Sequence, residues 1–272
     1  MFGFLKKRRH NRIRNRPFPG VWQEILAHRY SLYSRLPPPD RRELEGLIQV
    51  FLDEKQFEGC GGQEITDEVR LLIAAQACLL LLHRDTDCYP RLRSILVYPS
   101  SYFAKTWHWG RDGTITEEHQ ARGGESWPHG AVVLAWDGAA AGAVDLNKDR
   151  NLVLHEFAHQ LDQEDGVADG APLLEGANFL QTLHRYRVWA KVLSEEFQQL
   201  RHAAVEGRET VLDTYGAKNP AEFFAVATEC FFENPGRLQE RHPALYAELK
   251  EFYRQDPLRY ALTCPEKHDL PA

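Results

Sequence analysis

The sequence has few cysteines and no long apolar run, and each absence excludes a class of protein. Its five cysteines, an odd number, include no CxxC pair, which argues against a disulfide framework and against a cysteine zinc site. The longest mainly apolar run, residues 71–82, has 12 residues, too few to cross a bilayer as a helix. We therefore expect no transmembrane segment, and reduced thiols fit a cytoplasmic protein.

Acidic residues are absent from the first 16 residues, which contain seven lysines and arginines. No apolar segment of the signal-peptide type follows them, so we expect no secretory signal. The formal charge of the whole chain is −6, so the remainder is acidic and direct nucleic-acid binding is not expected. We interpret residues 1–16 as a basic, disordered tail and residues 17–272 as one domain. Attachment of the tail to an anionic membrane surface remains a weaker alternative.

Apolar periodicity predicts an α+β chain that is mainly helical, with a small mixed sheet. Asp40 and Glu43 have the spacing of a capping box, and Thr66 is a candidate N-cap. The predicted helices cover residues 21–36, a segment from 40, 66–83, 152–161 and 178–204, and the predicted strands cover 94–98, 114–119 and 131–136.

The stretch LVLHEFAHQL, residues 152–161, contains His155-Glu156-x-x-His159. On a helix, residues four apart lie on one face, so both imidazoles can reach one metal ion while Glu156 stands beside it. Two neutral histidines and one carboxylate are a typical ligand set of catalytic zinc, and an adjacent glutamate can take a proton from water. Apolar residues at helical spacing predict that this helix is buried with the histidines at its margin.

The helix of residues 152–161 follows a loop in which Asp145 or Asn147 is a candidate N-cap. The strand of residues 131–136 immediately precedes that loop. In zinc peptidases a strand at this place lines the cleft and pairs with an extended substrate. Whether residues 131–136 form such an edge strand or an interior strand stays open.

Two residues compete to be the third metal ligand. Asp165 lies six residues after His159, but the turning glycine expected between them is replaced by Asp162. Glu222 follows Asn219 and Pro220, which together predict a helix start. Glu222 could close a capping box onto Asn219 or project into a cleft, and the need for a carboxylate ligand favours the second reading.

Two further residues have candidate roles near Glu222. Tyr215 lies in a turn ended by Gly216, and its phenol could stabilise the oxyanion formed at a peptide carbonyl. Glu229 lies two turns beyond Glu222 and could accept a hydrogen bond from a ligating imidazole, although the sequence alone favours an ordinary surface position.

The stretches LVLHEFAHQLD and TYGAKNPAEFFAVATECFFENP, with the basic start MFGFLKKRR, resemble the Mlc titration factor A family of zinc peptidases, of the glutamate-zincin type. The resemblance implies a zincin-like domain that binds one Zn²⁺ per chain through His155, His159 and Glu222. It also implies that Glu156 is the catalytic base and that Tyr215 assists catalysis.

The resemblance further implies aminopeptidase-like cleavage of short peptides and binding of the glucose repressor Mlc, a regulator of sugar phosphotransferase genes. We therefore expect a cytoplasmic zinc metallopeptidase with a peptide substrate and, as a second partner, the Mlc protein. The alternative is a binding protein that sequesters a repressor without catalysis and whose zinc is structural or vestigial.

Overall fold

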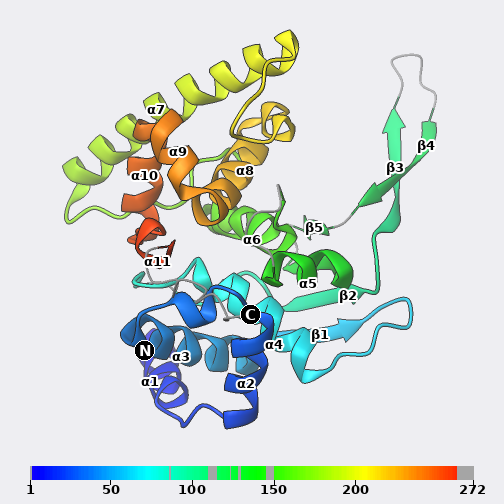
Figure 1. The fold of residues 1–272 in the computed structure, drawn as a ribbon, viewed down its shortest axis with the longest axis vertical. Helices are drawn as coiled ribbons and strands as arrows, with labels where there is room; N and C mark the ends of the chain where they lie inside the picture. Colours follow the sequence, from blue (N-terminus) through cyan, green and yellow to red (C-terminus); the bar gives the residue numbers. More distant parts are fainter. Residues whose placement is uncertain are drawn as a thin grey trace, which may run out of the picture.

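The computed structural model describes residues 2–85, 87–109, 115–122, 124–127, 130–144 and 150–261. The fold is α+β and mainly helical, as predicted, with a small sheet in the middle of the molecule (Figure 1). Its helices are α1 (Phe2–Arg14), α2 (Gly20–Arg29), α3 (Pro38–Glu54), α4 (Asp67–Leu79), α5 (Trp136–Val144), α6 (Leu152–Asp162), α7 (Phe179–Glu206), α8 (Pro220–Glu233), α9 (Pro235–Arg241), α10 (Pro243–Tyr253) and α11 (Leu258–Ala261). The described residues also form the short 3-10 helices η1 (Tyr33–Arg35), η2 (Gln163–Asp165) and η3 (Thr214–Ala217).

The central sheet has four strands in the order β1-β2-β6-β5. These strands are β1 (Gln56–Gly59), β2 (Ser94–Tyr98), β6 (Ala131–Ala135) and β5 (Gly124–Trp127). β1, β2 and β6 are parallel, whereas β5 runs antiparallel to β6. The strand of residues 131–136 is therefore interior, and the hypothesis that it is the edge strand is wrong, because β5 pairs along its outer side.

A separate antiparallel hairpin, β3 (Tyr102–Trp109) and β4 (Ile115–Arg122), projects from the body of the molecule (Figure 1). The predicted strands 94–98 and 131–136 correspond to β2 and β6, and the strand predicted at 114–119 overlaps β4, although Thr114 lies outside the described residues. β1, β3 and β5 were not predicted from the sequence. β1 and β5 have only four residues each, too few for alternating hydrophobicity to mark them.

One contiguous cluster of buried side chains runs through the fold, from Ile13 in α1 to Tyr260 in α11. Most of α4 is buried, and the predicted cap is confirmed because the Thr66 hydroxyl accepts a hydrogen bond from the Val69 amide at 3.3 Å. In Figure 1 the helices α1 to α4 lie on one side of the sheet and α7 to α10 on the other, with α6 between them. None of the helices that the structure describes is both long and apolar enough to span a membrane.

The N-terminal segment forms α1, which corrects the expectation of a disordered tail. Ile13 is buried, and the ring of His10 contacts a carboxylate oxygen of Glu54 at 2.7 Å. Arg9 pairs with Asp53 at the end of α3. Acidic partners about forty residues further along the chain therefore offset the repulsion between the basic side chains of α1. The composition of the N-terminal segment alone does not reveal these partners.

Several predicted helix boundaries also differ from the structure. Residues 21–36 form α2 and η1 rather than one helix. α3 begins at Pro38 without a side-chain cap, and the Glu43 carboxylate instead accepts a hydrogen bond from the His83 amide at 2.9 Å. The capping box predicted for Asp40 and Glu43 is therefore wrong.

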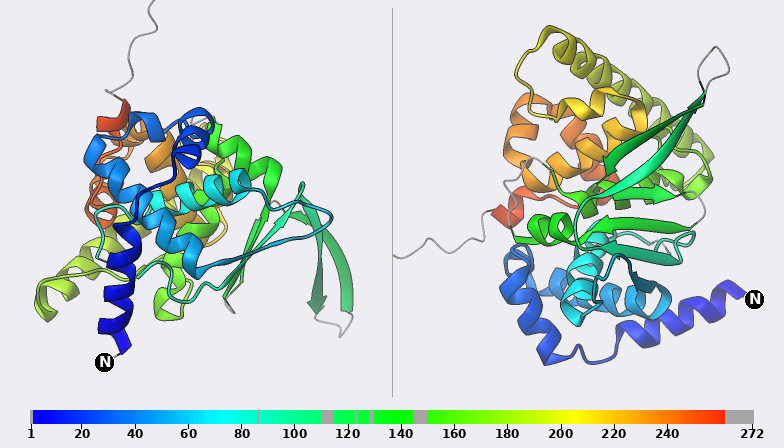
Figure 2. Two further views of the ribbon diagram at one scale, coloured as in Figure 1. Left: turned by 90° about the horizontal axis from the view of Figure 1, so that it is seen from below. Right: turned by 90° about the vertical axis from the view of Figure 1, so that its right-hand side faces the viewer.

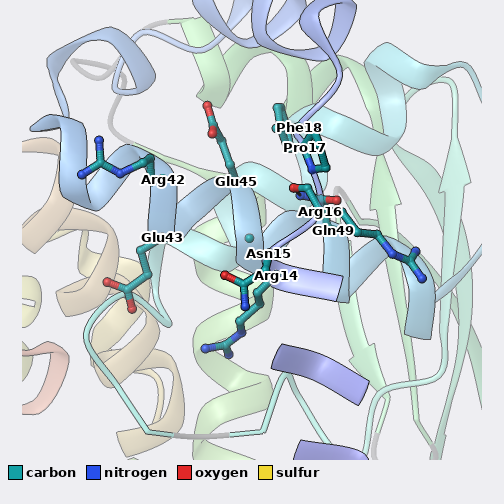
Figure 3. Close-up of a pocket in the computed structure, with 10 residues that line it drawn as sticks. Arg14, Asn15, Arg16, Pro17, Phe18, Arg42, Glu43, Glu45 and Gln49 are labelled. Atoms are coloured by element: carbon teal, nitrogen blue, oxygen red, sulfur yellow. Dashed lines mark hydrogen bonds between the residues drawn. The ribbon is translucent and has the colours of Figure 1, made fainter. Parts of the chain in front are cut away.

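A cavity of about 520 Å³ lies between the α1–α2 connection and α3 (Figure 3). The guanidinium groups of Arg14 and Arg42 point in different directions there, so they do not form a common anion site. None of the residues predicted to carry out chemistry lines this cavity.

Candidate metal centre

Helix α6 carries His155 and His159, and its start is fixed by Asn151. The Asn151 side chain accepts a hydrogen bond from the Leu154 amide at 3.0 Å, so Asn151 is the N-cap; the expected caps Asp145 and Asn147 lie outside the described residues. Its apolar residues enter the core while both imidazoles stay slightly exposed at the margin, which confirms the predicted orientation. The two rings are adjacent, with centroids 4.9 Å apart.

Helix α8 brings Glu222 to the same place. Asn219 accepts a hydrogen bond from the Glu222 amide at 2.9 Å and Pro220 occupies the first turn, so the predicted helix start is confirmed. The Glu222 side chain does not turn back to Asn219. Its Oε2 lies 3.0 Å from His155 Nε2 and 3.3 Å from His159 Nε2, which excludes the capping-box alternative.

One nitrogen or oxygen atom from each of His155, His159 and Glu222 lies within 4.8 Å of the other two. Asp165, the rival third residue, is not in this cluster. Its carboxylate accepts a hydrogen bond from the Val167 amide at 2.9 Å after η2. The fold therefore brings together the three residues that were predicted as ligands, and it places Asp165 in a local turn.

Glu229 fixes the orientation of His155. One of its carboxylate oxygens lies 2.7 Å from His155 Nδ1, and the other accepts a hydrogen bond from the Asn151 amide at 2.6 Å. Because a carboxylate accepts, Nδ1 must donate, which directs Nε2 toward Glu222. Of the two open readings of Glu229, the structure excludes a surface position, since this residue is buried.

Tyr215 borders the cluster on its open side and is 41% exposed. Its hydroxyl donates a hydrogen bond to Glu222 Oε1 at 3.3 Å. The Asp213 carboxylate accepts from the Tyr215 amide at 2.8 Å and pairs with Arg150 Nε at 2.7 Å. Asp213 and Arg150, which sequence reasoning missed, thus connect the turn of Tyr215 to the start of α6.

The histidines and glutamates of the cluster shift each other's pKa values. Burial lowers the pKa of His155, but the hydrogen bonds to Glu222 and Glu229 outweigh burial and raise this pKa to about 10. Burial likewise acts to raise the pKa of Glu222, whereas the hydrogen bonds from His155 and His159 hold it well below its usual range. The pocket therefore stabilises a carboxylate beside positive charge, which is the environment that a metal cation would supply.

Glu156 lies beside the cluster on α6 and is buried against strand β5. A Cβ atom added to Gly124 of β5 would stand 2.6 Å from a carboxylate oxygen of Glu156 and 2.6 Å from a methyl carbon of Leu152. Only glycine allows the edge strand to approach this carboxylate so closely. The role of Gly124 could not be predicted from the sequence, because it depends on the pairing of β5 with β6.

The fold and the clustered side chains define a zincin-like metallopeptidase domain: a helix carrying two histidines lies beside a small mixed sheet, and a distant helix supplies a glutamate. Residues 4–254 match the family model described as glucose-regulated metallo-peptidase M90. The chain belongs to this family, which confirms the resemblance to the Mlc titration factor A proteins.

Three relatives illustrate the similarity. An uncharacterized protein of Synechocystis is 43% identical over 251 residues, which cover 92% of this chain and 89% of that protein. Mlc titration factor A of Serratia proteamaculans is 32% identical, with 87% of each chain covered. Mlc titration factor A of Klebsiella pneumoniae is 31% identical, with 88% of this chain and 87% of that protein covered.

Proposed function

We propose that this protein is a zinc-dependent peptidase in which His155, His159 and Glu222 hold one Zn²⁺ ion. The observation that carries the proposal is the meeting of three donor atoms from α6 and α8 within 4.8 Å. Two imidazoles and one carboxylate are ligands that zinc accepts in hydrolases. Glu229 supports the same assignment, because its hydrogen bond to Nδ1 leaves His155 Nε2 directed at Glu222.

Bound zinc would supply Lewis acidity, which polarises a carbonyl group and lowers the pKa of a coordinated water. The proton-transfer step falls to Glu156. Its carboxylate, next to the cluster and shielded by β5, accepts the proton of the attacking water and then delivers it to the leaving amine. Burial against Gly124 restrains this carboxylate in one position.

Tyr215 is the proposed oxyanion donor. Its hydroxyl lies at the exposed side of Glu222, where an incoming carbonyl oxygen would meet it, and a phenol can donate one hydrogen bond to developing negative charge. The hydrogen bond from the Tyr215 backbone amide to the Asp213 carboxylate holds this turn in place.

The substrate that fits this arrangement is a short peptide. β5 is the outermost strand of the central sheet beside α6, so an extended peptide can pair with it while the scissile bond lies over the cluster. The aminopeptidase-like preference rests on the family resemblance, as does the cytoplasmic location.

The test is the variant Glu156→Gln, which removes the base and preserves the size of the side chain. We expect it to bind zinc with the stoichiometry of the wild type. Peptide hydrolysis should fall by at least about a thousandfold, since the group that accepts the proton of water and delivers it to the leaving amine is lost. Glu195→Gln on the exposed face of α7 is the matched control and should keep full activity. Undiminished hydrolysis by Glu156→Gln would refute the assignment.

A second candidate function is binding of the repressor Mlc, with or without catalysis. It is favoured by the names of the relatives that are called Mlc titration factor A and match across most of this chain. Complex formation with Mlc that persists after zinc is removed, together with no peptide turnover in the zinc-loaded protein, would support a sequestering protein without enzymatic activity. Absence of any complex with Mlc would exclude this function.

A further inference from the structure

The first turns of α7 expose large apolar side chains to solvent. Phe179 is 79% exposed, Leu180 75% and Leu183 37%. Trp189 is the first fully buried residue of this helix. About two turns of α7, before the partly buried Tyr186, therefore project beyond the core. Their apolar side chains are not buried by any other part of the described fold.

Basic residues lie on the same side of α7. At about 100° per residue, Phe179, Leu180 and Leu183 share an arc of about 120° with Arg187 and Lys191. Both basic side chains are exposed, and neither forms an ion pair with any residue that the structure describes. By contrast, Arg185 on the opposite side pairs with Glu251 at 2.9 Å.

Negative charge is missing from this part of the chain. The sequence contains no aspartate or glutamate between Glu175 and Glu195, and the Glu175 carboxylate is paired with Arg254 at 2.7 Å. An amphipathic helix end with exposed Phe and Leu beside unpaired Arg and Lys is typical of a segment that lies in the interface of an anionic bilayer.

A second basic element faces the same way. Both panels of Figure 2 show the N-terminal end of α1 and the beginning of α7 extending to the same side of the molecule. Arg8 and Arg12 of α1 are exposed one turn apart, and Leu5 is 58% exposed. One flat, negatively charged surface could therefore contact both helices.

We propose that this side of the molecule, formed by the first turns of α7 and the outer face of α1, binds anionic lipid bilayers peripherally. Phe179, Leu180 and Leu183 enter the interface, while Arg187, Lys191, Arg8 and Arg12 attract the lipid head groups. Each cation near such a surface contributes about fivefold to binding. The proposal is independent of the metal centre.

The experiment measures co-sedimentation of the full chain with vesicles of phosphatidylcholine mixed with phosphatidylserine and with vesicles of phosphatidylcholine alone. We expect binding to the anionic vesicles only, weakened by salt. The variant F179S/L180S should lower the affinity by at least about tenfold, and R187E/K191E should lower it further, by charge reversal. V205S, which replaces a residue that is 89% exposed at the other end of α7, is the matched control and should bind like the wild type.

A third variant, R8E/R12E, tests whether α1 takes part, because these side chains are exposed and their replacement leaves the buried Ile13 in place. Equal binding of wild type and F179S/L180S would overturn the proposal, as would equal binding to both kinds of vesicle. If the apolar residues instead bury a contact between two copies of the chain, size-exclusion chromatography will show a dimer that F179S/L180S converts to monomer without any loss of vesicle binding, and this result also overturns it.

Discussion

Glu229 joins two parts of the candidate centre through one buried carboxylate. It accepts hydrogen bonds from the ring of His155 and from the backbone of Asn151. Removing such an acceptor usually weakens metal binding 10- to 100-fold, because the imidazole loses its orientation. We therefore expect Glu229→Ala to raise the zinc dissociation constant by about that factor, measured by competition with a chromophoric chelator.

Glu229→Gln should have a smaller effect, since its amide oxygen can still accept from one of the two donors. The matched control is Glu233→Ala, which removes another buried carboxylate one turn further along α8. We expect the control to lower stability without changing zinc affinity. Equal zinc affinity of Glu229→Ala and the wild type would show that this carboxylate does not orient the ligand.

At the scale of single elements, the N-cap of α6 links helix stability to the site. The Asn151 side chain accepts from Leu154 and donates to the Gly142 carbonyl at 3.2 Å, and both interactions are buried. Asn151→Ala should lower the free energy of unfolding by about 2 kcal/mol. It should also weaken zinc binding, because the loss of the cap loosens the turn that contains His155.

The matched control is Thr66→Ala. Thr66 caps α4 as Asn151 caps α6, but it lies far along the chain from the metal ligands. Urea denaturation should show a loss of about 1 kcal/mol, and chelator competition should show unchanged zinc affinity. If both cap variants weaken zinc binding equally, the effect is one of global stability and not of the α6 start.

The elements also show how far sequence reasoning reaches. His155, His159 and Glu222 could be predicted because helical spacing and the Asn219-Pro220 start are local signals. Gly124 could not, because its contact with Glu156 depends on the order of strands in the sheet. The exposed start of α7 could not be predicted for a related reason: periodicity identifies one face of a helix but not how far along the helix the core extends.

At the scale of the whole molecule, buried carboxyl groups make stability depend on pH. Burial raises the pKa of Glu164 to about 7, although Arg84 acts in the opposite direction. The folded protein then retains a proton that the unfolded chain loses near its ordinary pKa of about 4.5. Stability from this group is present below about pH 4.5 and is lost as the pH rises toward 7.

Glu164→Gln should remove this dependence. We expect the variant to be more stable than the wild type at pH 8 by about 2 kcal/mol and equal to it at pH 4.5, as measured by urea denaturation across that range. Parallel stability curves for the two proteins would mean that Glu164 titrates normally in the fold.

The central claim is that two histidines of α6 and one glutamate of α8 hold a single metal ion. Its most direct test is metal analysis of the purified wild type beside Glu222→Ala, His155→Ala and Asp165→Ala, with circular dichroism to confirm folding. We predict one equivalent of zinc in the wild type and in Asp165→Ala, and a large loss of zinc from the other two variants. Full zinc content in folded Glu222→Ala, or its loss from folded Asp165→Ala, would contradict the account.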